Sequence, residues 1–201
     1  MSSRASILNS IRTHLGASAP CDPPKSVFSP VAPTPSIELF KQNVEAVDGH
    51  CVVVQSEEEL TRFLKNFAGR IAVSDAPILA GLGDVAPNAS DIFHYDVGIT
   101  TAQAAIADTG TLVLDSARER HRLVSLVPPV HVAIVDAASI FQTLGEALAF
   151  IHKNNNISPA VTFITGPSRT ADIELTLAIG VHGPQELYVI VNEGPPLTRR
   201  L

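Results

Sequence analysis

The chain has 201 residues, of which 45% are hydrophobic and 17% are charged, and its formal net charge is −6. This length suits one sizeable core and is short for two separate domains, and the composition is that of a folded globular protein. The negative charge argues against a broad basic surface, so we expect no nucleic acid among the partners.

Segments that would target the chain to a membrane or hold an iron–sulfur cluster are not evident. No apolar run approaches the ~20 residues that a membrane-spanning helix needs, and no secretory signal is recognisable, so we expect a cytoplasmic protein. Cys21 and Cys51 are too few for a disulfide framework or a four-thiolate cluster. The histidines form neither HExxH nor HxH, and no GxGxxG or GxxxxGK[ST] loop occurs, so we predict neither a metal nor a cofactor on this chain.

The first 36 residues are predicted to form a helix followed by a linker. Apolar residues recur there at helical spacing, at Ile7, Leu8, Ile11 and Leu15. With Gly16 as a stop signal, they predict an amphipathic helix over residues 1–16. Residues 17–36 are rich in proline and predict an extended linker, which leaves residues 37–201 as the α/β domain. The helix packs either on its own domain or, less commonly, on a partner chain.

Residues 37–74 alternate between helix and strand. Residues 37–47 have helical character, and the β-rich run 51–55 is suited to a buried strand. Ser56 and a glutamate three residues later form a capping box for a helix that runs to Gly69. Residues 70–74 are the next strand, and this order favours a parallel unit with a right-handed crossover.

The middle of the chain reads as a series of strands. Residues 104–107 and 111–114 flank Asp108-Thr109-Gly110, which predicts a tight turn between antiparallel strands. Residues 123–127 and 130–135 are predicted as further strands, separated by two prolines that suit an edge or a deliberate break.

The last third returns to alternation. It predicts a helix over 140–151, a strand over 161–165, a buried helix over 171–179 and a final strand over 187–191. The whole pattern predicts an α/β fold, a three-layer sandwich with a mixed, mainly parallel sheet.

The strongest candidate binding signal is the turn that joins the strand at 161–165 to the predicted helix. Free backbone N–H groups at a helix N-terminus favour an anion, and this end of the strands is where ligands usually bind in open α/β sheets. In this turn, which starts at Gly166, Arg169 can grip a carboxylate or phosphate, while Ser168 and Thr170 can donate hydroxyls. The alternative is that Ser168 or Thr170 only caps the helix and Asp172 favours its first turn.

Other polar residues also suit a ligand site. Asp108, beside Gly110 on a short turn, is a candidate general base or nucleophile, although such an aspartate more often bonds its own turn. His182 is a candidate acid, base or donor, or else a structural hydrogen-bonding group at a helix end. His131 is a further polar candidate.

Three alternating arginines form a candidate positive patch. Arg118, Arg120 and Arg122 lie on one face of any extended segment. Such a patch receives an anionic substrate or an acidic partner, although a solvated loop is the commoner outcome.

Several stretches resemble the signature of the LUD-domain family. They are VGIT at 97–100, AIADTGTLVL at 105–114, RLVSLVPPVH at 122–131, GPSRTADIE at 166–174 and GVHGP at 180–184. Their order and spacing cover roughly the C-terminal half, whereas the N-terminal half is similar only in organisation. The chain departs from the family pattern at Asp108, where the family usually has glutamate, and at Thr101, where it usually has glycine.

The resemblance implies a fold similar to the NagB/RpiA/CoA transferase-like superfamily, which includes sugar-phosphate isomerases and CoA transferases. It also implies a cluster-free subunit of a lactate-oxidising system, a component of an oxidoreductase complex whose iron–sulfur clusters lie on partner subunits. A small anionic metabolite would bind at Ser168, Arg169 and Thr170, with Asp108 and His182 nearby. Arg122 and His131 would be secondary contacts.

Two other functions and one open question of assembly remain. A free-standing enzyme, an isomerase, CoA transferase or cyclo-ligase-like protein, would act on a phosphorylated or CoA-linked substrate, with Asp108 as base or nucleophile. A non-catalytic interaction protein would dock through its N-terminal helix. Assembly into a homo-oligomer is compatible with all of these functions.

Overall fold

The computed structural model describes residues 3–15, 37–85, 87–116, 121–152, 160–170, 178–179 and 182–196. Its internal contacts divide the chain into residues 1–31 and residues 32–201. The first unit carries α1 (Ser3–Leu15), and the side chains of Ile7, Leu8 and Ile11 are exposed on it. The predicted linker at 17–36 lies outside the described residues. Among the described residues, no helix has the length and apolar character needed to cross a membrane.

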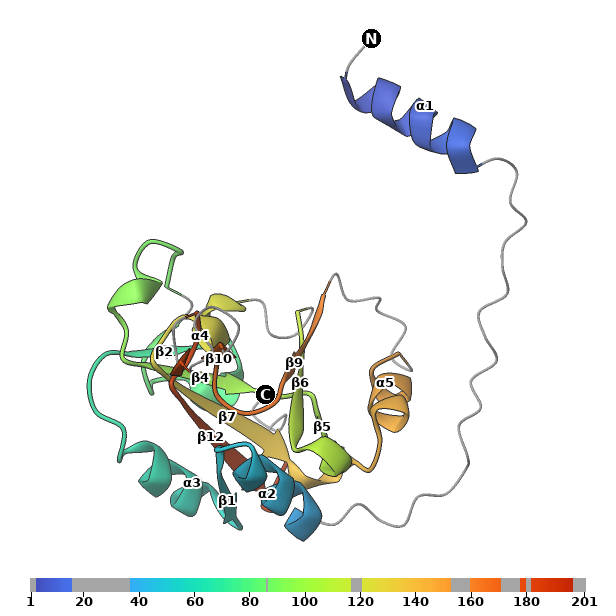
Figure 1. Ribbon diagram of the computed structural model, residues 1–201. Helices are drawn as coiled ribbons and strands as arrows, with labels where there is room; N and C mark the ends of the chain where they lie inside the picture. The colour runs from blue at the N-terminus through green and yellow to red at the C-terminus, as the bar shows by residue number, and fades with distance from the viewer. Residues whose placement is uncertain are drawn as a thin grey trace. The chain divides into compact units, whose positions relative to one another are not determined.

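The second unit is built on a six-stranded parallel sheet (Figure 1). Its strands, in spatial order, are β1 (His50–Val54), β12 (Glu186–Asn192), β7 (Val130–Asp136), β4 (Val97–Thr101), β2 (Ile71–Val73) and β3 (Asp84–Val85). Every neighbouring pair is parallel. The final strand of the sheet in sequence, β12, therefore lies between β1 and β7, one place in from the edge.

Each face of this sheet is covered by different elements, because side chains alternate along every strand. On one face Ile190 packs in a cluster with Leu60 and Leu64 of α3 (Glu57–Leu64). On the other face Val189 and Val191 pack with α2 (Ile37–Ala46) and with a second, smaller sheet. The sheet is thus buried on both sides, as parallel sheets require.

The smaller, four-stranded sheet contains two antiparallel pairs. Its strands are β8 (Ile140–Phe141), β5 (Ala104–Ile106), β6 (Thr111–Asp115) and β9 (Val161–Ile164), in that order. The β5–β6 and β6–β9 pairs are antiparallel and the β5–β8 pair is parallel. Helix α5 (Leu144–His152) packs on this sheet through Ala147 and Ile151, and Figure 1 shows it on the side away from α2 and α3.

Short elements complete the part of the chain that the structure describes. They are α4 (Leu123–Leu126), the paired strands β10 (Arg169–Thr170) and β11 (Ala178–Ile179), and the 3₁₀ turns η1 (Pro77–Leu79), η2 (Ile92–His94), η3 (Ala107–Thr109) and η4 (Ala137–Ser139). The arrangement confirms the predicted α/β fold with a mainly parallel sheet, with the antiparallel pairing confined to the small sheets.

Several local predictions hold and others are wrong. The capping box is present, since the Ser56 hydroxyl accepts the N–H of Glu59 at 3.2 Å, but α3 ends at Leu64 and not at Gly69. Residues 123–127 are wrong as a strand, because α4 occupies them. The two prolines precede β7, so they remove no hydrogen bond from it, and the strand can lie inside the sheet.

Candidate functional site

The turn that carries Asp108 is docked on helix α2. Gly110 has a φ of 62°, and a Cβ placed on it would lie 2.5 Å from the backbone carbon of Asn43. The Asn43 side chain donates a hydrogen bond of 2.7 Å to the carbonyl of Ala107. Only glycine therefore fits at this position, where the backbone of the turn meets the backbone of α2.

Asp108 itself is exposed and is held by one neighbour. Its carboxylate accepts a hydrogen bond from the side-chain amide of Gln142, and its N–H donates to the Gln142 carbonyl at 3.1 Å. These contacts fix the carboxylate at the surface, where a second molecule can reach it.

The turn after β9 meets α2 at its C-terminal end. Gly166 has a φ of 72°, and a Cβ on it would lie 2.5 Å from the carbonyl oxygen of Val47. The guanidinium of Arg169 donates to the same carbonyl at 3.0 Å and forms an ion pair with the carboxylate of Asp48. Both glycine-containing turns are thus packed on one helix.

A chain of hydroxyl groups connects the two turns. The Thr111 hydroxyl lies 2.7 Å from that of Thr109 and 2.8 Å from that of Thr165. Strand β6 brings these groups together, because its Leu112 is paired with Ile164 of β9. The turn of Asp108 and the turn of Gly166 are therefore neighbours, as a single site requires.

Ser168 points the other way, toward the loop before β12. Its N–H donates to the carbonyl of Pro184 at 2.8 Å, and a Cβ on Gly183 would lie 2.9 Å from the Ser168 Cβ. The same Cβ would lie 3.7 Å from the carbonyl oxygen of Leu126 in α4. His182 is exposed on this loop, so Ser168 and His182 lie in one region beside α4.

His131 is a fully buried histidine on β7. Its Nε2 lies 2.9 Å from the Thr100 hydroxyl, and its Nδ1 has no hydrogen-bond partner. Burial lowers the pKa of His131 to about 3, so the ring is neutral at physiological pH. In the register its neighbour on β4 is Gly98, where a Cβ would lie 1.9 Å from the carbonyl oxygen of Val124 in α4.

The arginine patch is only partly described. Arg122 is exposed at the start of α4, and its carbonyl accepts the hydroxyl of Ser125 at 2.9 Å. Arg118 and Arg120 lie outside the described residues, so the predicted patch stays a prediction.

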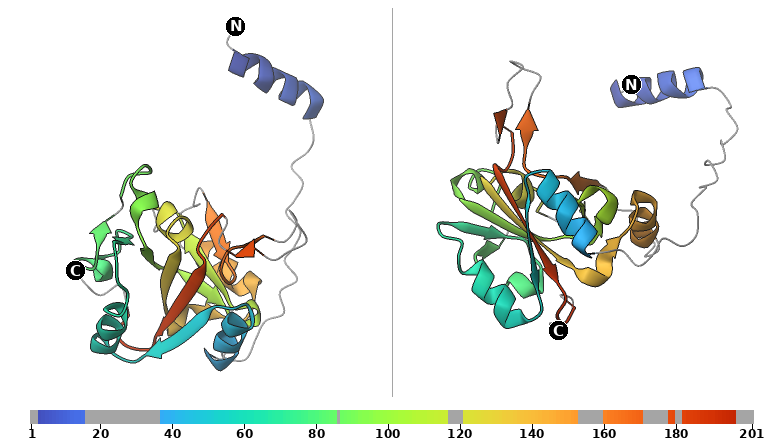
Figure 2. Two further views of the ribbon diagram at one scale, coloured as in Figure 1. Left: turned by 60° about the vertical axis from the view of Figure 1, so that its left-hand side comes forward. Right: turned by 60° about the horizontal axis from the view of Figure 1, so that its bottom comes forward.

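The predicted helix after the Gly166 turn differs from the structure. Arg169 and Thr170 form β10, which pairs with Ala178 and Ile179 of β11, so residues 178–179 are strand and not helix (Figure 2). The rest of that predicted helix, including Asp172, lies outside the described residues. The described residues thus give no helix N-terminus for an anion at Arg169.

The position of the turn relative to the main sheet also differs from the prediction. Val47 comes before β1, Pro184 before β12 and Pro129 before β7, and the carbonyl of Pro129 accepts the N–H of Gln185 at 2.7 Å. The turn therefore lies at the amino ends of the parallel strands. The rule that ligands bind at the carboxyl ends of parallel strands does not apply, because β9 belongs to the small sheet and not to the parallel sheet.

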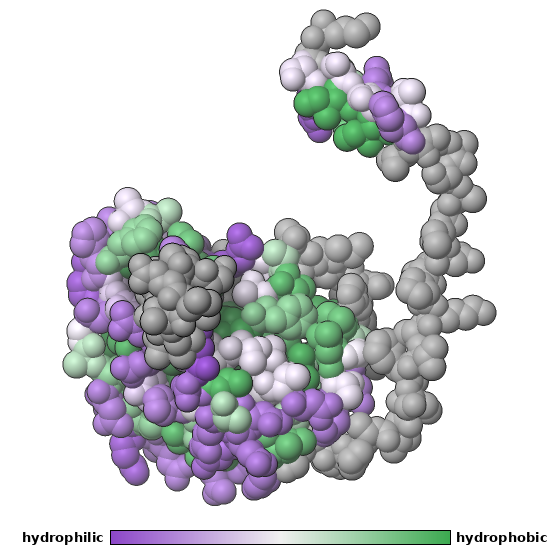
Figure 3. Space-filling model, viewed as in Figure 1, coloured by the Kyte–Doolittle hydropathy of each residue, from purple (hydrophilic) through white to green (hydrophobic). Residues whose placement is uncertain are grey.

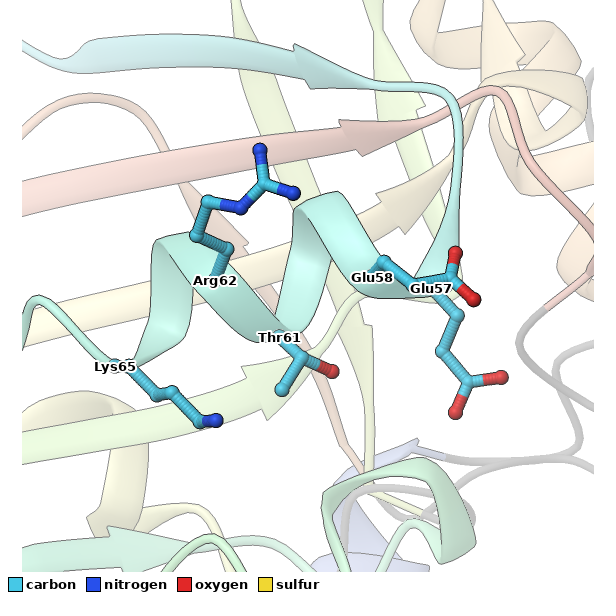
Figure 4. A pocket seen from close by; sticks show the side chains of 5 residues that line it. All are labelled: Glu57, Glu58, Thr61, Arg62 and Lys65. Atoms are coloured by element: carbon cyan, nitrogen blue, oxygen red, sulfur yellow. The ribbon is translucent and has the colours of Figure 1, made fainter.

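One surface groove lies apart from these residues (Figure 4). It is lined by Glu57, Glu58, Thr61, Arg62 and Lys65. All belong to α3 or its end, on the sheet face opposite α2, and the surface over this helix is mainly hydrophilic (Figure 3). Such a mixed-charge groove along one solvated helix has no convergent polar groups that define a site. No cluster of three or more metal-ligating side chains occurs among the described residues.

Sequence reasoning missed four side chains that hold the candidate residues in place. They are Asn43, Asp48, Thr100 and Gln142. Each contacts a residue at least 31 positions away in sequence, so no local pattern could reveal the contact. Asp48-Gly49 carried a weak signal, since such a pair marks the end of a helix.

The fold and these turns define an α/β protein of the LUD type. The sequence model of the LUD domain matches residues 83–191, and the chain belongs to this family. The chain is 45% identical over 98 residues to an uncharacterized protein of Neisseria meningitidis, an overlap of 48% of this chain and 42% of that protein.

Relatives with a named role are lactate utilization protein C sequences. The one from Bacillus subtilis is 40% identical over 103 residues, which covers 49% of this chain and 43% of the relative. The one from Anoxybacillus flavithermus is 32% identical over 158 residues, 78% of this chain and 70% of the relative. The chain spans about half the length of most of the curated relatives it matches.

A solved structure supports the fold directly. It is a DUF162 family protein from Deinococcus radiodurans, which superposes with a TM-score of 0.60 at 25% identity. The match covers 77% of this chain and 94% of the other chain.

Proposed function

We propose that the chain takes part in lactate utilisation, as a subunit that binds a small anionic metabolite beside Arg169. The role is supported by relatives named lactate utilization protein C. The binding site is supported by one observation: the segment from Gly166 to Thr170 contacts both α2 and the loop beside α4, and so lies between the two groups of candidate residues.

The chemistry of the segment suits a carboxylate. Arg169 offers a planar fork of N–H donors, which matches the two oxygens of a carboxylate. Ser168 supplies a hydroxyl at half-buried depth, and His182 stands exposed on the adjoining loop. His131 is a neutral imidazole, so it would contribute hydrogen bonds and no charge.

The redox chemistry of lactate oxidation would belong to partner subunits that carry iron–sulfur clusters. Cys51 is buried, and burial raises its thiol pKa to about 11. Since clusters are ligated by thiolates, a thiol held protonated in the core is unsuited to that role. Cys21 lies outside the described residues.

Thermal unfolding with added ligands tests the anion site. Lactate, pyruvate, a sugar phosphate, a nicotinamide nucleotide, a folate and CoA would each be added to the purified chain and to Arg169→Ala. A ligand that binds only the folded state stabilises it by about 2.7 kcal/mol at a hundredfold excess over Kd. We expect a shift with lactate or pyruvate that is lost in Arg169→Ala; no shift with either compound would refute the site.

A free-standing enzyme is a second candidate, and the exposure of Asp108 favours it. Its carboxylate is fixed by Gln142 yet open to solvent, which is the placement that a base or nucleophile needs. Isomerase or CoA-transfer activity of the purified chain without partners would support this function, provided that Asp108→Asn abolishes it. Activity that survives in Asp108→Asn would exclude the residue from that role.

A further inference from the structure

Asp48 occupies a left-handed backbone position directly after helix α2. Helix α2 ends at Ala46, and the N–H groups of Asp48 and Gly49 donate to the carbonyls of Glu45 (3.1 Å) and Val44 (2.9 Å). Asp48 has a φ of 60° and is the only non-glycine residue with a positive φ among the described residues. This left-handed position after a helix is normally taken by glycine or asparagine.

The charge of Asp48 is also unfavourable where it stands. A carboxylate at the C-terminal end of a helix faces the negative end of the helix dipole. The last turn of α2 contains no basic residue to offset this charge, and Lys41, one turn earlier, is paired with Glu45 at 3.8 Å. The helix dipole therefore disfavours the charge of an aspartate at this position, where glycine or asparagine is the usual residue.

Arg169 is the compensating group. Its guanidinium pairs with the Asp48 carboxylate and donates to the Val47 carbonyl at 3.0 Å. The side chain of Asp48 is 69% exposed and that of Arg169 is 32% exposed. The pair is thus open to solvent on the aspartate side, and such exposed pairs contribute little to stability.

We propose that the Asp48 carboxylate occupies the position on Arg169 where the carboxylate of a ligand binds. A monoanionic ligand would then bind by displacing the Asp48 carboxylate from the guanidinium. This inference rests on the proposed function, since it takes Arg169 as the anion-binding residue. Asp48 therefore competes with the ligand for Arg169, which weakens ligand binding and keeps Arg169 occupied in the free protein.

The surroundings select a carboxylate over a phosphate. The arginine faces the Val47 carbonyl and the negative end of α2, so the local potential offsets part of its charge. A dianionic phosphate would meet this negative potential with twice the charge of a carboxylate. A singly charged, planar group matches both the charge and the fork geometry of the site.

Titration calorimetry on the full chain tests the proposal with lactate, pyruvate and inorganic phosphate as probes. Asp48→Asn removes the charge and keeps a residue that tolerates a positive φ, and Asp48→Gly is a second variant that suits the backbone. Asp91→Asn is the matched control, because Asp91 is exposed and forms no ion pair with any of the described residues. Arg169→Ala removes the binding group.

We expect lactate or pyruvate to bind both Asp48 variants about two- to fivefold more tightly than wild type, the range that an exposed ion pair is worth. Asp91→Asn should bind like wild type, and Arg169→Ala should not bind. Arginine-dependent binding that is unchanged or weaker in both Asp48 variants would overturn the competitor role and leave the proposed site intact. Equal tightening for phosphate would overturn the carboxylate preference, and no binding by wild type or either variant would refute the site itself.

Discussion

His131 should make the stability of the protein depend on pH in a way that one substitution removes. The folded chain keeps this histidine neutral, because burial lowers its pKa to about 3, whereas an unfolded histidine has a pKa of about 6.5. Below the unfolded value, the unfolded chain therefore binds a proton that the folded chain does not. Stability from this group is complete above about pH 6.5 and is lost as the pH falls toward 3.

The size of the effect follows from the linkage relation. Each pH unit between the two pKa values is worth about 1.4 kcal/mol, and the loss from about pH 7 to pH 5 sums to about 2 kcal/mol. The group is fully buried, so solvent does not screen this effect. Carboxylates also titrate in acid, but they contribute equally to wild type and to a histidine variant.

Urea unfolding at about pH 7 and about pH 5 measures the effect. His131→Gln cannot titrate, so it should lose about 2 kcal/mol less than wild type between the two pH values, whatever its absolute stability. His182→Gln, which removes an exposed histidine, is the control and should retain the wild-type pH dependence. Equal losses in wild type and His131→Gln would refute the reasoning that a neutral imidazole is buried on β7.

Three further predictions concern the surroundings of the site. An alanine in the left-handed region costs about 1–2 kcal/mol of folding stability. In chemical denaturation Gly81→Ala should lose only this amount, because a Cβ on Gly81 has open space around it. Gly110→Ala should lose more, because its Cβ would also clash with the backbone of α2. Thr100→Val should cost about 1–3 kcal/mol in the same assay, because it removes the one hydrogen-bond partner that the described residues offer to the buried His131 ring. Thr100→Ser should restore most of this loss. Deletion of residues 1–35 should leave the melting temperature of the main domain unchanged. If α1 is the docking element, the same deletion should abolish co-purification with an iron–sulfur partner. A complex that still forms would exclude that role for α1.

The elements that sequence could predict are those with a clear period or a capping signal. The alternation of β5 and β6 around Asp108-Thr109-Gly110 predicted their antiparallel pairing, which the structure confirms. The Ser56 capping box fixed the start of α3. These features depend on residues within a few positions of one another, so a single sequence contains the information.

The elements that were predicted wrongly are short apolar runs, and a short apolar run fits a buried helix as well as a buried strand. Residues 123–127 contain leucine and valine in a pattern that fits either a helix or a strand. Tertiary packing favours the helix α4 that the structure shows. The carbonyl of Val124 packs against β4 at Gly98, an approach that requires the absence of a side chain at residue 98. This close contact joins a helix carbonyl to a glycine 26 positions earlier, and no local sequence pattern in either segment predicts it.

The candidate site could not be placed from sequence because it depends on the order of strands in the sheet. The pattern of residues 187–191 predicted a final strand but not the position of that strand, β12, between β1 and β7. That position brings Pro184 next to Pro129 and carries Ser168 with it, while Arg169 reaches back to Val47 and Asp48 before β1. The amino ends of three strands thus meet around one short segment, although they are up to about 140 residues apart in the chain. Because β12 is the strand that joins β1 to β7, its place in the sheet brings the parts of the candidate site together.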